Sequence, residues 1–557
     1  MKLRTGRQYE TYEFCFAAPA PQGDCVDIGF SASIGKAGEP LLTIRGFYAG
    51  DGHYKLRFLP EGTGDYTYRL QGPFPELEEE GTLRIEPAAQ GRHGPVRADG
   101  IALRYADGTW FPSFGTTIYA LANQSQPLID ETLDTLSRAP FNKLRTCVFP
   151  KHYQYNANNP ERYPFEAKPG RERKEFSAEG LPVMPVKRNA PDDYWDTTRP
   201  CFPFWDHLEE MLRRLDGLGI QVDLILFHPY DRWGFASMSR EDNLRYLDYL
   251  LRRLSAFPNL WWSLANEYDL CFNKTGEDFR AFEAFIGERD PYRHLCSNHN
   301  CFQIWDASSE HITHVSWQTK MLSRVAEMIQ TYRKPVLIDE CRYEGDLPEF
   351  WGNLSGKDMV RSFWRVMAQG GYCTHGETWL PGPAQDALAT KTGEKDVVWW
   401  AKGGRLNGES PARIAFLRQV IEGLPGPLEP LTGGMKDWAA MDDSHLHSLI
   451  ASMPEDFGCF LNSIAAMNRE ERLKFFAVEY SYQGHCGEEA YLYYLDDQCA
   501  AAFDINLPER RQYRIEVLDT WEMTRTTAMS GVNGSLRVAL PGKPYMAVLA
   551  ISEEEGG

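Results

Sequence analysis

The sequence predicts a (β/α)8 barrel flanked by an N-terminal β-sandwich and a C-terminal all-β domain. Three observations lead to this prediction: short alternating strands at the start, apolar segments separated by helical patterns in the middle, and short strands again at the end. A chain of 557 residues is also too long for one ordinary core. We expect domains at 1–92, 93–424 and 425–557.

The first region carries the pattern of an antiparallel sandwich. Segments such as "VDIGFSASI", "HYKLRFLP" and "GDYTYRLQG" alternate apolar and polar residues and are separated by Gly and Pro. Turn signals recur about every ten residues, a spacing typical of all-β sandwiches. The stretch "EPAAQGRHGPVRADG" then leads into the second region.

The middle region alternates helices with strands that are apolar on both faces. One helix places Leu208, Met211, Leu212, Leu215 and Leu218 on a single face. Strands apolar on both faces indicate a parallel sheet covered by helices, and eight such units fit a barrel. The long insertion at 150–203 is expected to wall or cover the site. The eight strand segments are "WFPSFGTT", "FNKLRTCVF", "QVDLILF", "LWWSLA", "HLCSN", "THVSWQ", "KPVLID" and "GYCTHGETW".

Composition excludes several classes of function. A net charge of −19 argues against nucleic acid or an anionic membrane surface as a partner. No apolar run approaches the roughly 18 residues of a membrane span, and the first residues lack an apolar export signal. Twelve cysteines without a CxxC pair are expected to be reduced thiols in a cytoplasmic protein with no metal and no cofactor.

Two glutamates stand where apolar strands finish. Glu267 follows the fourth strand and Glu340 follows the seventh. Barrel enzymes place their chemistry at these strand ends, and the two strands lie on opposite sides of an eight-stranded barrel. Two opposed carboxyls are what glycoside hydrolysis needs. A single glutamate at a strand end is more often a helix cap or a surface ion-pair partner, so the joint placement carries the argument.

The motifs around these glutamates resemble a known family. "FPKHYQYN", "LILFHPYDRWGF", "WWSLANEYD", "THVSWQT" and "VLIDECRYEG" look like the bacterial three-domain proteins with an apiosidase-like barrel, within the clan A retaining glycoside hydrolases. The flanking segments "GFYAGDGHYKLRFLPEGTGDYTY" and "VLDTWEMT" are similar to that family's terminal β-domains. The resemblance therefore covers nearly the whole chain.

The resemblance implies individual roles. Glu340 would be the nucleophile and Glu267 the acid/base. Asn266 would bond the sugar 2-hydroxyl, and Arg145 would keep Glu340 ionised by lowering its pKa. The sequence departs from many clan members at the sixth strand, which carries no aromatic hydroxyl, so Gln318 or a tyrosine from elsewhere is expected to bond the nucleophile.

Other polar and aromatic side chains near the strand ends are candidates for sugar contact, each with a structural alternative. The histidines could be hydrogen-bonded structural imidazoles, Asp231 could pair with Arg232, and Trp379 could plug the barrel top. Glu377 is a third acid and could be the partner of Glu267 instead. Lys151 begins the long loop and is expected to wall the site. The candidates are His228, Asp231, His299, Trp317, Gln318, Glu377 and Trp379.

The predicted function is exo-acting hydrolysis of small oligosaccharides or glycosides, either a pentofuranoside such as an apioside or a β-pyranoside. The expected partner is a carbohydrate substrate, and a homo-oligomer is possible. One alternative is a metal-dependent barrel hydrolase, which commonly carries HxH at the end of the first strand; that strand ends "GTTIYA", without histidine. The other is a catalytically silent carbohydrate-binding protein.

Overall fold

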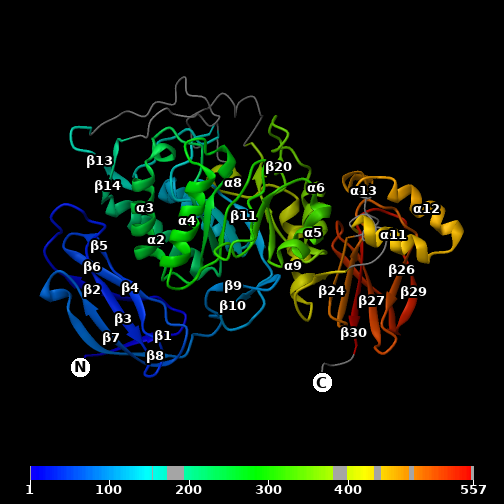
Figure 1. Ribbon diagram of the computed structural model, residues 1–557, viewed down its shortest axis with the longest axis horizontal. Helices are drawn as coiled ribbons and strands as arrows, with labels where there is room; N and C mark the ends of the chain where they lie inside the picture. The colour runs from blue at the N-terminus through cyan, green and yellow to red at the C-terminus, as the bar shows by residue number, and fades with distance from the viewer. Residues whose placement is uncertain are drawn as a thin grey trace. The chain divides into compact units, whose positions relative to one another are not determined.

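The structure is a computed structural model that describes residues 2–153, 155–171, 193–380, 398–431, 441–475 and 482–553. The chain forms two compact units (Figure 1). The first contains Met1–Lys320, Tyr332–Met359 and Tyr372–Pro411, and therefore holds both the N-terminal β-domain and the barrel strands. The second contains Met321–Thr331, Val360–Gly371 and Ala412–Gly557.

The N-terminal region is a two-sheet β-domain, as the sequence predicted. One sheet has the order β1-β8-β7-β3-β4 and the other the order β2-β6-β5. In β7, Tyr66, Tyr68 and Leu70 are buried while the residues between them are exposed, so the alternating pattern marks the inner face. The strands are β1 Lys2–Arg7, β2 Tyr12–Ala17, β3 Ser31–Gly35, β4 Leu42–Arg45, β5 Phe47–Gly50, β6 His53–Phe58, β7 Gly64–Gln71 and β8 Glu79–Glu86.

The barrel consists of eight parallel strands, each overlapping one predicted segment. Their order is β17-β16-β15-β12-β11-β21-β19-β18. The two end strands are joined outside the ladder, because Thr313 N–H donates to the Cys296 carbonyl at 2.9 Å. The barrel is therefore nearly closed. The strands are β11 Phe114–Thr117, β12 Lys143–Cys147, β15 Gln221–Phe227, β16 Leu260–Ala265, β17 Cys296–Ser297, β18 Val315–Gln318, β19 Val336–Glu340 and β21 Tyr372–His375.

The helices follow the predicted alternation with the strands. In α2, Leu208, Met211, Leu212 and Leu215 are buried, but Leu218 caps the helix and is 40% exposed, so its assignment to the buried face was wrong. The α-helices of this region are α1 Gln126–Leu136, α2 Phe202–Gly217, α3 Arg240–Leu254, α4 Gly276–Arg289, α5 Val325–Tyr332, α6 Gly356–Met367, α8 Trp399–Lys402 and α9 Ser410–Glu422.

Short elements fill the connections between these strands and helices. The inserted loop carries a two-stranded hairpin, β13 paired with β14, and β20 pairs with β22 beside the barrel. No helix in the described ranges combines the length and apolar character needed to cross a membrane. The remaining elements are β9 Val96–Asp99, β10 Ala102–Tyr105, β13 Phe165–Ala167, β14 Trp195–Pro200, β20 Glu344–Gly345, β22 Glu377–Thr378, η1 Pro75–Leu77, η2 Leu121–Asn123, η3 Phe235–Ser237, η4 Tyr268–Leu270 and η5 Leu322–Arg324.

A buried ion-pair network fixes the N-terminal β-domain to the barrel helices within the first unit. Arg57, from β6, donates to Glu209 of α2 at 2.7 Å and to the Arg253 carbonyl of α3 at 2.7 Å. Arg253 also donates to Glu209. The two guanidinium groups lower the pKa of Glu209 to about 2, despite its burial.

The second unit is built on an antiparallel sheet of order β23-β24-β25-β30-β27-β28, with β26 paired to β29. In the described part of the segment between β23 and β24 there are three helices, a feature the strand patterns did not predict. Asp442 caps the first of them by accepting the Ser444 and His445 N–H groups. The elements are β23 Glu429–Pro430, α11 Asp443–Ser452, α12 Glu455–Ala465, α13 Arg469–Phe475, β24 Tyr482–Cys486, β25 Ala490–Tyr494, β26 Ala502–Leu507, β27 Tyr513–Asp519, β28 Thr524–Val532, β29 Gly534–Ala539 and β30 Met546–Ser552.

Candidate active site

Local backbone irregularities set the side-chain directions of both predicted glutamates. Glu267 lies two residues after the end of β16 and adopts a left-handed conformation (φ 54°, ψ 60°), which is unfavourable for a non-glycine residue and is typical of functional sites. Glu340 ends β19 at a register shift between β18 and β19. Trp317 pairs with Ile338, but the next residue, Gln318, pairs with Glu340, so β19 has one extra residue at Asp339. The extra residue lets Asp339 and Glu340 both face the barrel interior.

Gln318 and His299 each lie beside both Glu267 and Glu340. The Gln318 amide nitrogen is 3.4 Å from Glu267 Oε1, and with its oxygen and nitrogen exchanged the same amide donates to Glu340 Oε2 at 3.1 Å. His299 Nδ1 accepts the Glu267 N–H at 3.4 Å, and its Nε2 is 3.9 Å from Glu340 Oε1. The fold thus brings the predicted pair, Gln318 and His299 into one site.

A tyrosine from the first barrel strand bonds Glu340. Tyr119, two residues after β11, donates its hydroxyl to Glu340 Oε1 and lies 2.9 Å from Asn266 Oδ1. Asn266 Nδ2 in turn lies 3.3 Å from Glu267 Oε2. The sixth strand carries no aromatic hydroxyl, and the hydroxyl that bonds Glu340 comes from Tyr119 instead. The sequence predicted a tyrosine from another part of the chain but did not identify which one.

Glu267 has a tyrosine of its own. Tyr230, in the loop after β15, donates its hydroxyl to Glu267 Oε2. Its ring packs edge-on against Tyr153, with centroids 5.6 Å apart. The neighbours His228 and Asp231 were predicted from the sequence and Tyr230 was not, although all three belong to "FHPYD".

Charged side chains are buried behind Glu340. Arg145 is fully buried, with Nε 3.2 Å from Asp223 Oδ2 and Nη1 3.7 Å from Glu340 Oε1. Lys143 pairs with Asp223 at 3.2 Å and also with Asp339. Arg145 thus adjoins Glu340 as expected, and it has no exposed surface with which to touch a sugar.

Burial outweighs Arg145 in setting the ionisation of Glu340. Burial and the neighbouring Glu267 raise the pKa of Glu340 to about 7, while Arg145, Tyr119 and Lys151 act in the opposite direction. Arg145 therefore lowers the pKa of Glu340 as expected, but burial and Glu267 raise it by more, so the net shift is upward. Two neighbouring carboxyl groups disfavour double ionisation, which is why Glu267 adds to the rise in the pKa of Glu340.

A buried lysine faces the pair. Lys151 is only 4% exposed, and its Nζ lies 3.3 Å from the ring centroid of Tyr119, 4.5 Å from that of Tyr230 and 5.2 Å from that of Trp400. Such contacts stabilise the ammonium through the ring quadrupoles. Burial lowers the pKa of Lys151, while the charges of Glu267 and Glu340 oppose that shift.

Aromatic rings form a wall beside these groups. The Trp400 ring lies 5.5 Å from Tyr119, 5.7 Å from Tyr343 and 5.0 Å from Trp351 (centroid to centroid). A Cβ atom at position 376 would come within 2.0 Å of the Tyr343 ring, which explains the glycine in "THGETW". Trp400, which follows the last strand in "VVWWAK", was not predicted from the sequence.

Two of the predicted sugar contacts are structural. His228 Nε2 lies 3.2 Å from the Phe149 carbonyl, and burial lowers the pKa of His228 to about 3, so the ring is a neutral, buried imidazole. Asp231 accepts the N–H groups of Trp233, Gly234 and Ala236 and thereby fixes the turn after β15. These contacts give both residues a structural role in the loop after β15.

Three further residues were predicted to contact the sugar: Glu377, Trp317 and Trp379. Glu377 is buried and accepts the Asn407 N–H, facing Glu344 instead of the catalytic pair, and burial raises its pKa to about 7. Trp317 is buried, and strand alternation puts it on the face opposite Ser316 and Gln318. Trp379 is partly exposed, two residues before the undescribed segment 381–397.

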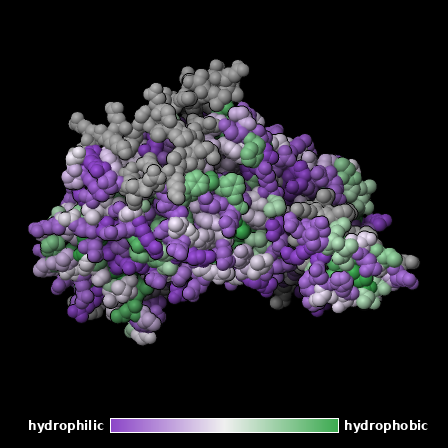
Figure 2. Space-filling view, turned by 45° about the horizontal axis from the view of Figure 1, so that its top comes forward, coloured by the Kyte–Doolittle hydropathy of each residue, from purple (hydrophilic) through white to green (hydrophobic). Residues whose placement is uncertain are grey.

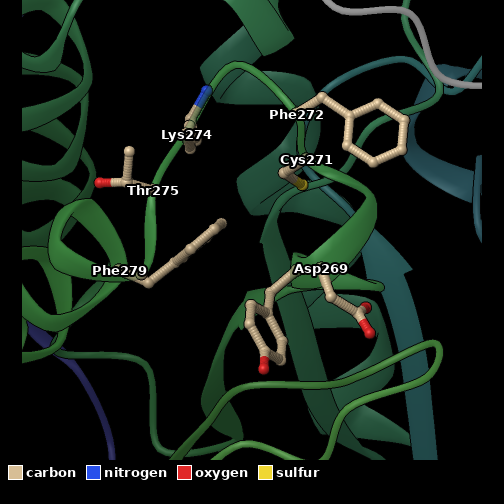
Figure 3. A pocket seen from close by; sticks show the side chains of 8 residues that line it. Asp269, Cys271, Phe272, Lys274, Thr275 and Phe279 are labelled. Carbon is tan, nitrogen blue, oxygen red and sulfur yellow. The ribbon is translucent and has the colours of Figure 1, made fainter.

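The chain directly after Glu267 forms a pocket of about 320 Å³ (Figure 3). Phe279 projects into it opposite Cys271, with Lys274 and Asp269 at its borders (Figure 3). Asp269 also accepts the N–H groups of Cys301 and Phe302 at 2.7 Å and so anchors the loop after β17. The lining includes neither Glu267 nor Glu340, so this pocket is separate from the carboxyl pair.

The nearly closed parallel barrel with carboxyls at two strand ends defines a glycoside hydrolase of the clan A type. Residues 98–425, more than half of the chain, match the family described as "Apiosidase-like, catalytic domain". The chain belongs to this apiosidase-like family of glycoside hydrolases, and its substrate is a carbohydrate. Residues 5–72 and 479–550 match domains of unknown function, DUF5060 and DUF5605.

Solved structures agree with this assignment. A protein of Bacteroides vulgatus ATCC 8482 described as a "putative glycoside hydrolase" is 31% identical, with a TM-score of 0.80 over 99% of this chain and 100% of that one. A glycoside hydrolase family 5 protein of the same organism is 13% identical, with a TM-score of 0.55 over 82% and 94% of the two chains, which shows a shared fold. No curated protein matches this sequence.

Proposed function

We propose that the enzyme is a retaining glycosidase in which Glu340 is the nucleophile and Glu267 the acid/base. The observation that carries this proposal is the paired setting of Glu267 and Glu340, with Gln318 beside both carboxyl groups and His299 beside the Glu340 carboxyl and the Glu267 N–H. The hydroxyl of Tyr119 and the charge of Arg145 adjoin Glu340. These groups favour its anionic form, which is the form that attacks.

In the first step, Glu340 attacks the anomeric carbon while the bond from that carbon to the leaving oxygen breaks. Glu267 gives its proton to that oxygen, and the sugar becomes an ester of Glu340. In the second step, Glu267, now a carboxylate, takes a proton from water as the water oxygen attacks the same carbon. The ester bond breaks, and both carboxyls return to their starting forms.

The neighbouring tyrosines support this division of roles. Tyr119 donates to Glu340, so its hydrogen bond holds the oxygen that attacks and weakens when that oxygen becomes an ester. Tyr230 donates to Glu267 and orients it. Asn266 lies between Tyr119 and Glu267, where its amide can bond the hydroxyl adjacent to the anomeric carbon.

The substrate we propose is a small glycoside cleaved from its end, either a pentofuranoside such as an apioside or a β-pyranoside. Apolar groups are scattered among hydrophilic side chains on the face shown in Figure 2. Three exposed phenylalanines stand on loops that follow barrel strands: Phe272 (46% exposed), Phe302 (83%) and Phe350 (63%). Phenyl rings pack against the C–H faces of sugars, so these residues are suited to contact the leaving group.

The test compares wild type, Glu340→Gln and Glu267→Gln on aryl and alkyl glycosides of a panel of furanosides and pyranosides. We expect Glu340→Gln to lose nearly all activity on both types. Glu267→Gln should lose about 10²–10⁴-fold on alkyl glycosides, whose leaving group needs a proton, and less in the first step with p-nitrophenyl glycosides.

Glu349→Gln is a matched control, because Glu349 bonds Tyr155 in the same unit. Proton NMR of the first product formed should show the anomeric configuration of the substrate. An inverted first product, or wild-type rates in both variants at 267 and 340, would overturn the proposal.

A further inference from the structure

A second group of ligand-type side chains lies beside the last barrel strand. Glu344 is opposite Glu377 in the β20–β22 pair, and His375 ends β21. All three are at most 1% exposed. One ligand atom from each lies within 4.8 Å of the other two. None of the proposed hydrolysis steps uses this cluster.

Two atoms of the cluster are buried without a hydrogen-bond partner: His375 Nε2 and Glu377 Oε2. The other imidazole nitrogen, His375 Nδ1, is held 3.1 Å from Thr116 Oγ1, and Thr116 also accepts from Trp399 Nε1 at 2.9 Å. A histidine oriented through one nitrogen, with the other free, is the usual arrangement of a metal ligand.

In the part of the chain that the structure describes, no cation of the protein balances the charge of this cluster. Within the described ranges, neither Glu344 nor Glu377 forms an ion pair. Glu344 accepts the Glu409 and Ser410 N–H groups at 2.7 and 3.2 Å, and Glu377 accepts the Asn407 N–H. Two adjacent carboxylates buried in this way are unfavourable unless a cation or a proton joins them.

The backbone is shaped around these carboxyls. A Cβ atom at Gly408 would lie 2.5 Å from Glu344 Oε2, and one at Gly356 would lie 2.9 Å from Glu344 Oε1. Both positions therefore leave room only for the carboxylate. Tyr343, the neighbour of Glu344, contacts Tyr119 at 3.4 Å between the hydroxyl oxygens, so the cluster adjoins the wall of the carboxyl pair.

We propose that Glu344, His375 and Glu377 bind one divalent transition cation of the Zn²⁺ or Mn²⁺ type. One imidazole nitrogen with two carboxylate sites suits such ions, whereas Mg²⁺ and Ca²⁺ prefer oxygen alone. The ion joins β20, β21, β22 and the turn at 407–410, and it acts as a structural element of the barrel. The proton transfers between Glu267, Glu340 and the substrate do not pass through it.

The experiment measures metal content and thermal unfolding of the full chain after chelator treatment and addition of Zn²⁺ or Mn²⁺ alone. Wild type should retain about one ion per chain after gel filtration, with a Tm several degrees higher than without metal. Glu377→Gln and His375→Asn should retain none and show no rise. Asparagine at 375 keeps an amide near Thr116 while removing the atom in the Nε2 position.

Glu283→Gln is the matched control, because Glu283 is also a buried glutamate but bonds Trp305 and lies outside the cluster. This variant should bind the ion as wild type does. Absence of bound metal in wild type would overturn the proposal and assign the cluster a shared proton. Equal binding by wild type and both cluster variants would place the ion elsewhere and equally overturn it. Because the readout is metal content, glycosidase activity does not enter the result.

Discussion

The hydroxyl of Tyr119, beyond the first barrel strand, donates to Glu340 at the end of the seventh. Only β21 separates these strands in the sheet. Tyr119 therefore reaches the carboxyl from the side, while Arg145 lies 3.7 Å from the same oxygen. A neutral donor and a cation together offset part of the burial that raises the pKa of Glu340.

Replacing Tyr119 by Phe should lower kcat/KM about 10- to 100-fold, because a hydrogen bond to a charged group contributes about 1.5–3 kcal/mol. In wild type the Tyr119 hydroxyl lowers the pKa of Glu340, so its removal should raise that pKa. The acidic limb of the kcat/KM profile should therefore also move to higher pH. Tyr155→Phe, which removes the hydroxyl that donates to Glu349, should leave the profile unchanged. An unshifted limb in Tyr119→Phe would contradict the assigned contact.

Replacing Lys151 by Met should shift the same limb in the same direction. Glu340 acts as a carboxylate, so activity is present above its pKa and lost as pH falls; removing a nearby positive charge raises that pKa. The comparison is with Lys274→Met, whose ammonium bonds the Ala236 carbonyl in the loop after β15. If the two lysine variants have identical pH profiles, Lys151 does not act on the pair.

Glu340→Gln should be more stable than wild type above about pH 7. The folded-state pKa of about 7 exceeds the ordinary value of 4.5, so wild type loses stability as pH rises through this interval. The gain should be on the order of 1–3 kcal/mol at pH 8 and vanish near pH 4. Urea unfolding at pH 8 and pH 4 measures this difference in free energy between the variant and wild type. An equal difference at both pH values would show that ionisation of Glu340 is not its cause.

Glu209→Gln should destabilise the protein by about 3–5 kcal/mol at pH 7, because it leaves Arg57 and Arg253 buried without their carboxylate. The pKa of Glu209 is lowered to about 2, so its contribution is present above about pH 4.5 and lost as pH falls toward 2.

Unfolding free energies at pH 7 and pH 3 measure this loss. Between pH 7 and pH 3 the unfolding free energy of Glu209→Gln should fall less than that of wild type. The exposed neighbour Glu210, replaced by Gln, serves as control and should change stability by less than about 1 kcal/mol. A variant at 209 with wild-type stability at pH 7 would show that the network does not hold the two parts together.

The framework of the barrel was predictable because its signals are local. A strand such as Gln221–Phe227 is buried on both faces, so its apolar residues form an uninterrupted run in the sequence. Glu267 and Glu340 stand out because each interrupts such a run. The helices at 443–475 were missed, because the short-strand pattern of the flanking segments was extended across them.

The sequence by itself determined the barrel, its terminal β-domains and the two strand-end glutamates, since periodicity and polarity are properties of neighbouring residues. Only the tertiary structure decided which side chains surround that pair. Tyr119, Tyr230 and Lys151 come from loops after three different strands. The bonds of Tyr119 to Glu340 and of Tyr230 to Glu267, and the packing of Lys151 on the Tyr119 ring, depend on barrel closure. It also decided the sign of the pKa shift at Glu340, because burial, which exists only in the folded chain, outweighs the cation beside it.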